Sequence, residues 1–230
     1  MVEQEQSAFM LHSRPYRENQ QLVDLLTEYN GKVTAIAYSG KTNKSNKKGL
    51  LQPFLPLKIV LKGHNQLKNL SRVEASGKSY QLNHHYLYSG FYVNELLVRL
   101  LGEHVICAEM FQCYQKTLFD LSQQKSIETI LRQFEMMLLD ELGLSIDFSP
   151  VFELTSSSYY YIQEQGFIPA LDKLPLPCYD GLHLQAIAQQ ELSTQQVLNT
   201  YKVLMRQIIN GLLDNKPLNS RKLFIKRELN

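Results

Sequence analysis

The spacing of hydrophobic residues changes character near residue 80. Before it, stretches rich in Val, Ile, Leu, Phe and Thr alternate with turn residues at 7–12, 20–28, 32–38, 54–62 and 66–74. Each stretch has the length and composition of a β-strand, and Asn30-Gly31 predicts a tight hairpin turn between the second and third. Five short strands in sequence are typical of a small barrel, and the OB-fold is the common five-stranded form.

From about residue 84 onward, apolar residues recur every three to four positions. The pattern predicts helices at 91–101, 108–121, 126–142 and 193–212. Ser126 and Ser193 are expected to cap the last two helices, and Gly143 to end the helix that Ser126 begins.

Residues 145–180 interrupt this helical pattern. The segments 159–162 and 166–168 predict a short β-hairpin, and nearby prolines exclude a continuous helix. We therefore expect an α+β protein in two domains. Residues 1–80 form an N-terminal five-stranded OB-fold β-barrel, and residues 81–230 form a mostly α-helical C-terminal domain with a small β-hairpin and a basic C-terminal segment.

Charge is partitioned along the chain, although the formal net charge is only +2. Residues 1–80 hold 12 Lys and Arg against 6 acids, residues 81–200 hold 5 against 14, and residues 201–230 hold 7 against 2. A basic module joined to an acidic one predicts a polyanion partner for the first and a different kind of partner for the second.

The composition excludes several classes of protein. A hydrophobic share of 44% and a charged share of 20% are those of a folded chain, and no apolar run approaches the roughly 18 residues of a membrane-spanning helix. The acidic first residues do not resemble a secretion signal, and three cysteines, an odd number, fit a reducing compartment. We expect a cytoplasmic protein that does not contact membranes.

Motifs for catalysis are incomplete. Residues 40–42 and 77–79 end like phosphate-binding loops, but Ala35 and Arg72 stand where that motif needs its first glycine. The three cysteines lack the spacing of zinc ligands. We expect no catalytic residue, no metal and no cofactor, and leave open a metal-dependent nuclease that draws its carboxylates from distant positions.

Residues 39–49 contain four lysines, no acid and no large apolar residue, which predicts an exposed loop between the third and fourth strands. One interpretation is a solubilising loop, in which case the chain could be a protein-binding adaptor. Further cations and aromatic rings in the same barrel favour DNA binding through phosphates and stacked bases. The candidate DNA-binding residues are Arg14, Arg17, Lys32, Lys41, Lys44, Lys47, Lys48, Lys68, Arg72, Tyr16 and Tyr38.

Short strings stand in a characteristic order along the chain. They are LHSRPYRE at 11–18, LTE at 26–28, GKV at 31–33, LQPF at 51–54, YSG at 88–90, YVNELL at 92–97, RQFE at 132–135, LL at 138–139, LG at 142–143, GFI at 166–168 and SRKLF at 220–224. In this order they resemble the bacterial RecO family of recombination mediators along nearly the whole sequence.

That resemblance implies an OB-fold, a helical C-terminal domain and no catalytic turnover. The family binds single- and double-stranded DNA, anneals complementary strands, and works with RecR to load the RecA recombinase onto DNA covered by single-stranded-DNA-binding protein, so a bacterial cytoplasmic, nucleoid-associated protein is expected. Some members hold zinc through four cysteines, but residues 148–167 contain none, so this chain is expected to be metal-free.

The acidic, apolar C-terminal tail of single-stranded-DNA-binding protein is a further partner that the resemblance implies. Such a peptide needs an apolar groove with a positive rim, and we expect Arg132 beside Phe134 to contribute to it. The alternative for Arg132 is an ion pair with a neighbouring Glu. Four basic residues near the C-terminus are expected to dock RecR or extend the DNA path, with plain solvent exposure as the alternative: Arg221, Lys222, Lys226 and Arg227.

Overall fold

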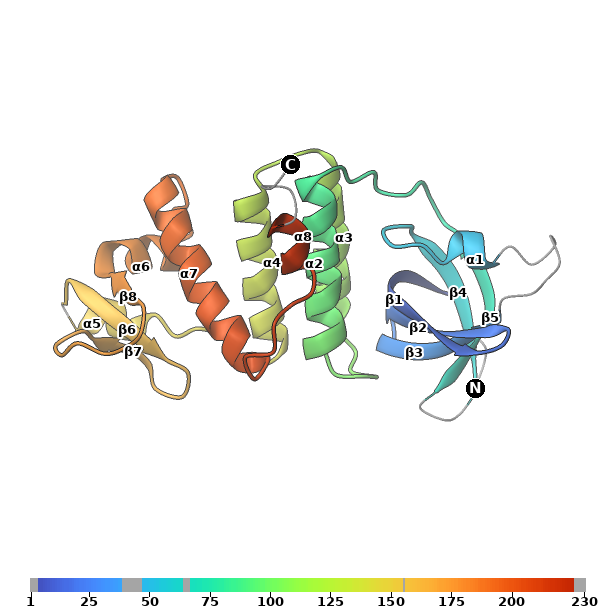
Figure 1. Ribbon diagram of the computed structural model, residues 1–230, viewed down its shortest axis with the longest axis horizontal. Coiled ribbons are helices and arrows are strands. Elements are labelled where there is room, and N and C mark those ends of the chain that lie inside the picture. The colour runs from blue at the N-terminus through green and yellow to red at the C-terminus, as the bar shows by residue number, and fades with distance from the viewer. Residues whose placement is uncertain (1–3, 39–46, 64–66, 155, 226–230) are drawn as a thin grey trace. The chain divides into compact units, whose positions relative to one another are not determined.

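The computed structural model describes residues 4–38, 47–63, 67–154 and 156–225 (Figure 1). The chain divides into two compact units, one formed by Met1–Lys125 with Leu218–Asn230 and the other by Ser126–Pro217. It therefore returns to the first unit after completing the second. These units differ from the expected domains at 1–80 and 81–230, because two long helices beyond residue 80 pack with the barrel. The boundary at residue 80 stays a prediction.

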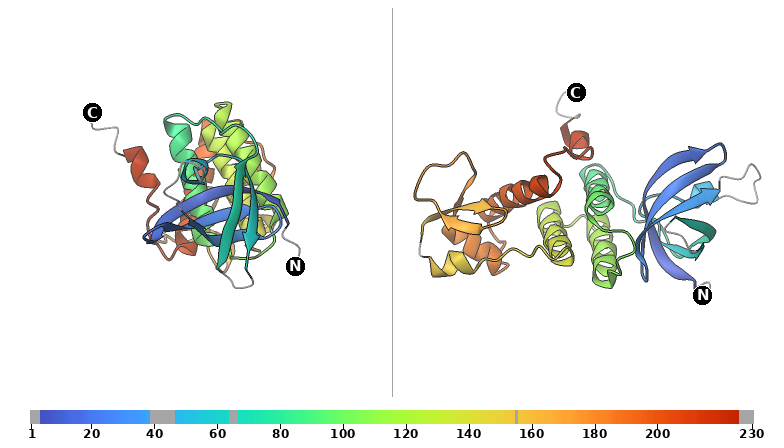
Figure 2. Two further views of the ribbon diagram at one scale, coloured as in Figure 1. Left: turned by 90° about the vertical axis from the view of Figure 1, so that its right-hand side faces the viewer. Right: turned by 90° about the horizontal axis from the view of Figure 1, so that it is seen from below.

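The first five strands close into a barrel (Figure 2) in the order β1-β2-β3-β5-β4. β3 and β5 pair in parallel, and the other neighbours pair antiparallel. This is the predicted OB-fold barrel. The strands are β1 (Gln6–Arg17), β2 (Gln20–Thr27), β3 (Gly31–Tyr38), β4 (Leu57–Lys62) and β5 (Lys68–Ala75).

Alternate side chains of the strands fill the barrel, as the period of two requires. Val23 and Leu25 of β2 meet Leu57 and Ile59 of β4 in one buried cluster. Residues 28–30 form the turn between β2 and β3, and Gly31, at φ +63°, begins β3 opposite Thr27. The hairpin predicted at Asn30-Gly31 is therefore confirmed. A one-turn helix that the sequence pattern does not predict, α1 (Lys47–Leu50), precedes β4.

Three helices complete the first unit, namely α2 (His85–Leu100), α3 (Ala108–Ser122) and α8 (Arg221–Ile225). Phe9 of β1 packs against Phe111 and Tyr114 of α3, with ring centroids 5.7 and 5.1 Å away. These aromatic contacts bury Phe9 on the outer side of β1, so α3 covers the barrel there.

The second unit combines helices with a three-stranded sheet in the order β7-β6-β8. Its elements are α4 (Ile127–Glu141), α5 (Ser149–Glu153), β6 (Ser158–Ile162), β7 (Gly166–Pro169), β8 (Cys178–Asp180), α6 (Gly181–Ala188) and α7 (Gln195–Leu212). The predicted hairpin is β6–β7, and β8 is the strand that the pattern missed.

Helix capping agrees with the sequence at one end and differs at another. The Ser126 side chain accepts a hydrogen bond from the amide of Thr129, as expected of the cap of α4. The cap of α7 is Thr194, which accepts from the amide of Val197, rather than Ser193. Both residues can cap, and the helix begins at the second.

Candidate nucleic-acid interface

The exposed end of β1 carries three of the candidate DNA-binding residues. Residues 12–17 are exposed, and the Arg17 guanidinium lies 5.1 Å from the centre of the Tyr16 ring. Tyr16 itself is 40% exposed. A cation held over an exposed ring can offer both a phosphate contact and a stacking face.

Tyr38 lies at the same end of the barrel. Gln20, the first residue of β2, pairs with Arg17 on one side and with Tyr38 on the other. Tyr38 is 52% exposed. The structure therefore brings Tyr16, Arg17 and Tyr38 together across the ends of three neighbouring strands, and we call this group the strand-end cluster.

The lysine-rich segment begins directly after Tyr38. Lys41 and Lys44 lie outside the described residues, and Lys47 and Lys48 fall in α1 with side chains that are not described. Their predicted DNA contacts stay predictions.

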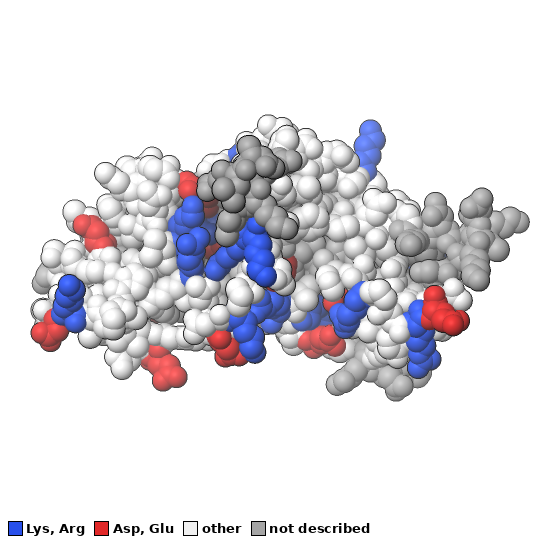
Figure 3. Space-filling model, viewed as in Figure 1, with Lys and Arg blue, Asp and Glu red and all other residues white. Residues whose placement is uncertain are grey.

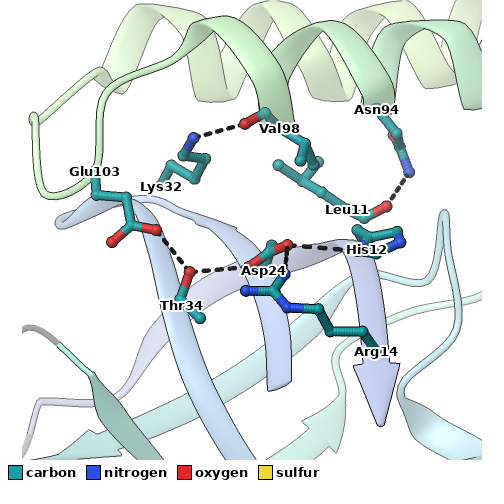
Figure 4. Close-up of polar contacts among 9 residues, drawn as sticks. All are labelled: Leu11, His12, Arg14, Asp24, Lys32, Thr34, Asn94, Val98 and Glu103. Atoms are coloured by element: carbon teal, nitrogen blue, oxygen red, sulfur yellow. Dashed lines mark hydrogen bonds and ion pairs between the residues drawn. The ribbon is translucent and has the colours of Figure 1, made fainter. Parts of the chain in front are cut away.

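Arg14 is held in place by a buried carboxylate. Its Nη1 lies 2.9 Å from Oδ2 of Asp24 on β2, and Nδ1 of His12 lies 3.5 Å from the same oxygen (Figure 4). Thr34 donates its hydroxyl to Asp24 Oδ1 at 2.9 Å or to Glu103 at 2.7 Å, one at a time, because it has one proton. The Arg14 side chain is still 48% exposed, so its remaining N–H groups can reach a ligand.

Lys32 is not placed as a phosphate contact. It is buried, and its Nζ donates to the carbonyl of Val98 on α2 at 2.8 Å (Figure 4). Desolvation lowers the pKa of Lys32, although Glu103 and Asp24 oppose the shift. The difference from the sequence interpretation arises because the β2–β3 turn is covered by the loop after α2, where the amide of His104 donates to the Lys32 carbonyl.

Lys68 and Arg72 lie on β5, which pairs with β3. Lys68 donates to the carbonyl of Gly63 at 3.2 Å. Arg72 pairs with Glu74 at 2.8 Å and contacts Glu5 at 4.0 Å, and the hydrogen bond with Glu74 raises its pKa. Basic and acidic side chains are interspersed on the face shown in Figure 3.

Arg132 and Phe134 differ from the rim that we expected. Phe134 is fully buried in the second unit, and Arg132 is buried and pairs with Glu135 on the same helix. The alternative ion pair is the one observed, although it is enclosed rather than on the surface. Helical spacing in α4 predicted the pair but not its burial.

The basic C-terminal segment is anchored on α2. Arg221 lies 6.0 Å from the centre of the Tyr92 ring, and Phe224 stacks on His85 at 6.1 Å. Lys222 is exposed, while Lys226 and Arg227 lie outside the described residues.

The described residues offer no assembled metal site, since no three of their His, Cys, Asp or Glu side chains are grouped to hold an ion. Cys107 is buried, Cys113 half-buried and Cys178 exposed, and none of these three described residues forms a disulfide. Among the described helices, none combines the length and apolar character needed to cross a membrane.

Comparison with known proteins agrees with the fold. The family model described as "Recombination protein O N terminal" matches residues 1–78, and "Recombination protein O C terminal" matches residues 82–169. The DNA repair protein RecO of Cellvibrio japonicus (strain Ueda107) is 40% identical over 230 residues, which cover 95% of each chain. That of Hahella chejuensis (strain KCTC 2396) is 39% identical over 227 residues, 95% of this chain and 93% of its own. The RecO of Haemophilus influenzae (strain PittGG) is 40% identical over 232 residues, 97% of each chain. The chain belongs to the RecO family of DNA repair proteins.

Proposed function

We propose that this protein is a DNA-binding mediator of recombination in DNA repair, without an active site. It binds single- and double-stranded DNA, anneals complementary strands in the bacterial cytoplasm at the nucleoid, and helps RecR to load RecA onto DNA coated by single-stranded-DNA-binding protein. The observation that carries DNA binding is the strand-end cluster, where Arg17 and two exposed tyrosines meet beside the start of the lysine-rich segment.

The chemistry of this cluster explains low sequence specificity. Arg17 and the lysines of the segment that follows Tyr38 contact phosphates, which every strand carries. Tyrosine rings stack on any base. Annealing needs two polyanions held together with their base-pairing edges free, and neutralising the phosphates reduces their repulsion.

Partner binding rests on other surfaces. The start of α8, with half-buried Arg221 and exposed Lys222, is the described basic surface that we assign to RecR or to the continuing DNA path. The tail of single-stranded-DNA-binding protein stays a proposed partner. Since Arg132 is enclosed, its rim role requires Arg132 to leave Glu135.

An annealing assay tests the proposal. Two complementary labelled strands, one coated with single-stranded-DNA-binding protein, are mixed with the protein, with or without magnesium. We expect duplex at full length and a rate that falls with salt. Shortened strands would instead indicate a nuclease. If the protein neither changed the annealing rate nor bound the DNA, it would be a protein-binding adaptor.

A further inference from the structure

A pocket of about 440 Å³ lies where β1, α2 and the start of α8 meet, all within the first compact unit. Three segments distant in sequence supply its mainly apolar lining, with Leu11 from β1, Phe91 and Val98 from α2, and Leu223 from α8. The volume is in the range of small-ligand sites.

Fixed hydrogen bonds hold two of its walls. Leu11 is the extra residue of a β-bulge. Met10 and His12 are two residues apart on β1, but their partners on β2, Leu25 and Asp24, are adjacent. The carbonyl that the bulge leaves unpaired accepts from Asn94 Nδ2 at 3.0 Å. A pocket whose walls are fixed before the ligand arrives costs less ordering on binding.

The other wall depends on Glu95. Its carboxylate accepts from the amides of Asn219 and Ser220 at 2.9 and 2.8 Å and from the Ser220 hydroxyl at 2.6 Å. Arg99 lies 3.6 Å from the same carboxylate. The acid of the pocket is therefore engaged by α8, and its charge is balanced by Arg99.

The rim is basic and is continuous with the proposed DNA surface. His12, 53% exposed at its side chain, lines the pocket, and Arg14 follows it on β1 (Figure 4). Tyr16 and Arg17 come next on the same strand. Lys222, exposed in the first turn of α8, is the chain neighbour of the lining residue Leu223. A ligand here needs an apolar body with negative charge on its flanks.

We propose that the pocket takes one unstacked base of a single strand, which lies against Phe91 and Leu223 while the flanking phosphates contact His12, Arg99 and Lys222. The inference rests on the proposed DNA binding and assigns it a second contact point beyond the strand-end cluster. We favour a nucleotide over an acidic peptide because β1 leads from the proposed DNA surface into the pocket, and because a strand places a phosphate on both sides of every base.

The test compares oligo-dT with an abasic oligomer of equal length and charge. Wild-type protein should prefer oligo-dT by at least on the order of tenfold, the effect of one stacked base, because the base in the pocket adds to those on Tyr16 and Tyr38. Leu223→Trp, which fills the pocket, should reduce that preference at least threefold and leave affinity for the abasic strand unchanged. Leu182→Trp, at an exposed position of the second unit, is the matched control and should retain the preference.

Photocrosslinking of the wild-type protein to 5-iodouracil oligomers gives a measurement independent of the folding of any variant. Crosslinks that map to the residues His12 or Phe91 support the pocket, whereas crosslinks at Tyr16 report the strand-end cluster. Crosslinks confined to other residues, or a base preference that Leu223→Trp leaves undiminished, overturn it and leave the pocket to another ligand such as an acidic peptide. Failure to bind either strand would instead refute the proposed DNA binding itself.

Discussion

The side-chain amide nitrogen of Asn94 on α2 donates a hydrogen bond of 3.0 Å to the carbonyl of Leu11 at the β-bulge of β1. The side-chain oxygen of Asn94, Oδ1, accepts from the hydroxyl of Tyr114 on α3 at 2.7 Å. One buried side chain thereby connects the barrel to both long helices of its unit. The bulge would otherwise leave a buried carbonyl without a partner.

Replacing Asn94 with Ala should destabilise the first unit by about 3 kcal/mol, since the Leu11 carbonyl and the Tyr114 hydroxyl both lose their partner. Tyr114→Phe removes one of the two bonds and should cost about 1 kcal/mol. Urea denaturation measures the loss of unfolding free energy in both variants, and hydrogen exchange of β1 and α3 locates that loss. Equal losses for the two variants would contradict the role of the Leu11 bond.

Gly31 should tolerate no side chain. At φ +63° an added Cβ would lie 1.7 Å from the carbonyl oxygen of Val105, so Gly31→Ala must displace the loop after α2 as well as strain the turn. Gly143 has a similar φ of +69° with no atom within 4 Å, which makes Gly143→Ala the matched control. We expect a loss of about 1 kcal/mol for the control, from backbone strain, and of about 3 kcal/mol or more for Gly31→Ala. Segment-resolved hydrogen exchange measures each loss of stability. Equal losses for Gly31→Ala and Gly143→Ala would show that the loop after α2 moves aside at little cost.

Local patterns were sufficient to predict the barrel and the main helices. The period of two before residue 80 and the Asn30-Gly31 turn are properties of neighbouring residues, and the strands and hairpin follow from them. Tyr16 and Tyr38 were candidates from the sequence, but their exposure is known only from the structure.

Burial of charged side chains depends on long-range packing, which local sequence patterns do not predict. Lys32 stands in a basic stretch, yet the loop after α2, some seventy residues later, covers it. Arg132 and Glu135 are spaced as a surface pair would be, and only the tertiary fold encloses them. The return of α8 to α2 depends on Glu95 meeting Ser220 across 125 residues, which no periodicity reports.

Docking of α8 should depend on pH. Burial disfavours the charged form of Glu95, but hydrogen bonds from Ser220 and Asn219 and the charge of Arg99 outweigh it, so the pKa lies below its ordinary value of 4.5. A lowered pKa contributes stability that is complete above 4.5 and is lost as pH falls through the folded-state value. The protection factors of residues 218–224, which correct for the intrinsic pH dependence of amide exchange, should therefore fall below about pH 4.5 in the wild type. Glu95→Gln should show low protection already at pH 7 and no such transition, whereas Glu153→Gln, an exposed acid of α5, should behave as the wild type.

Substitutions of Arg17 and Lys32 should show whether DNA affinity depends on direct phosphate contact or on positive charge alone. Arg17→Gln is expected to weaken binding to single-stranded DNA and to reduce the slope of log affinity against log salt by about 0.7, the value of one phosphate contact. Lys32→Met keeps the buried aliphatic chain and should leave both quantities unchanged while lowering thermal stability. Fluorescence anisotropy over a range of KCl concentrations tests this pair, and an equal change of slope in both variants would place Lys32 on the DNA path after all.

The lysine-rich segment should supply most of the electrostatic affinity. If Lys41, Lys44, Lys47 and Lys48 each neutralise one phosphate, their joint replacement by Ala should reduce the salt slope by about 3 on single strands. Annealing should slow in the same variant because fewer phosphates are neutralised while two strands are close. A control that replaces Lys173, Lys202 and Lys216 of the second unit by Ala also removes positive charge but lies outside the barrel, and its slope should match the wild type. If the four-lysine variant kept the wild-type slope, the segment would be a solubilising loop, and the barrel would bind DNA through Arg14, Arg17 and the exposed tyrosines alone.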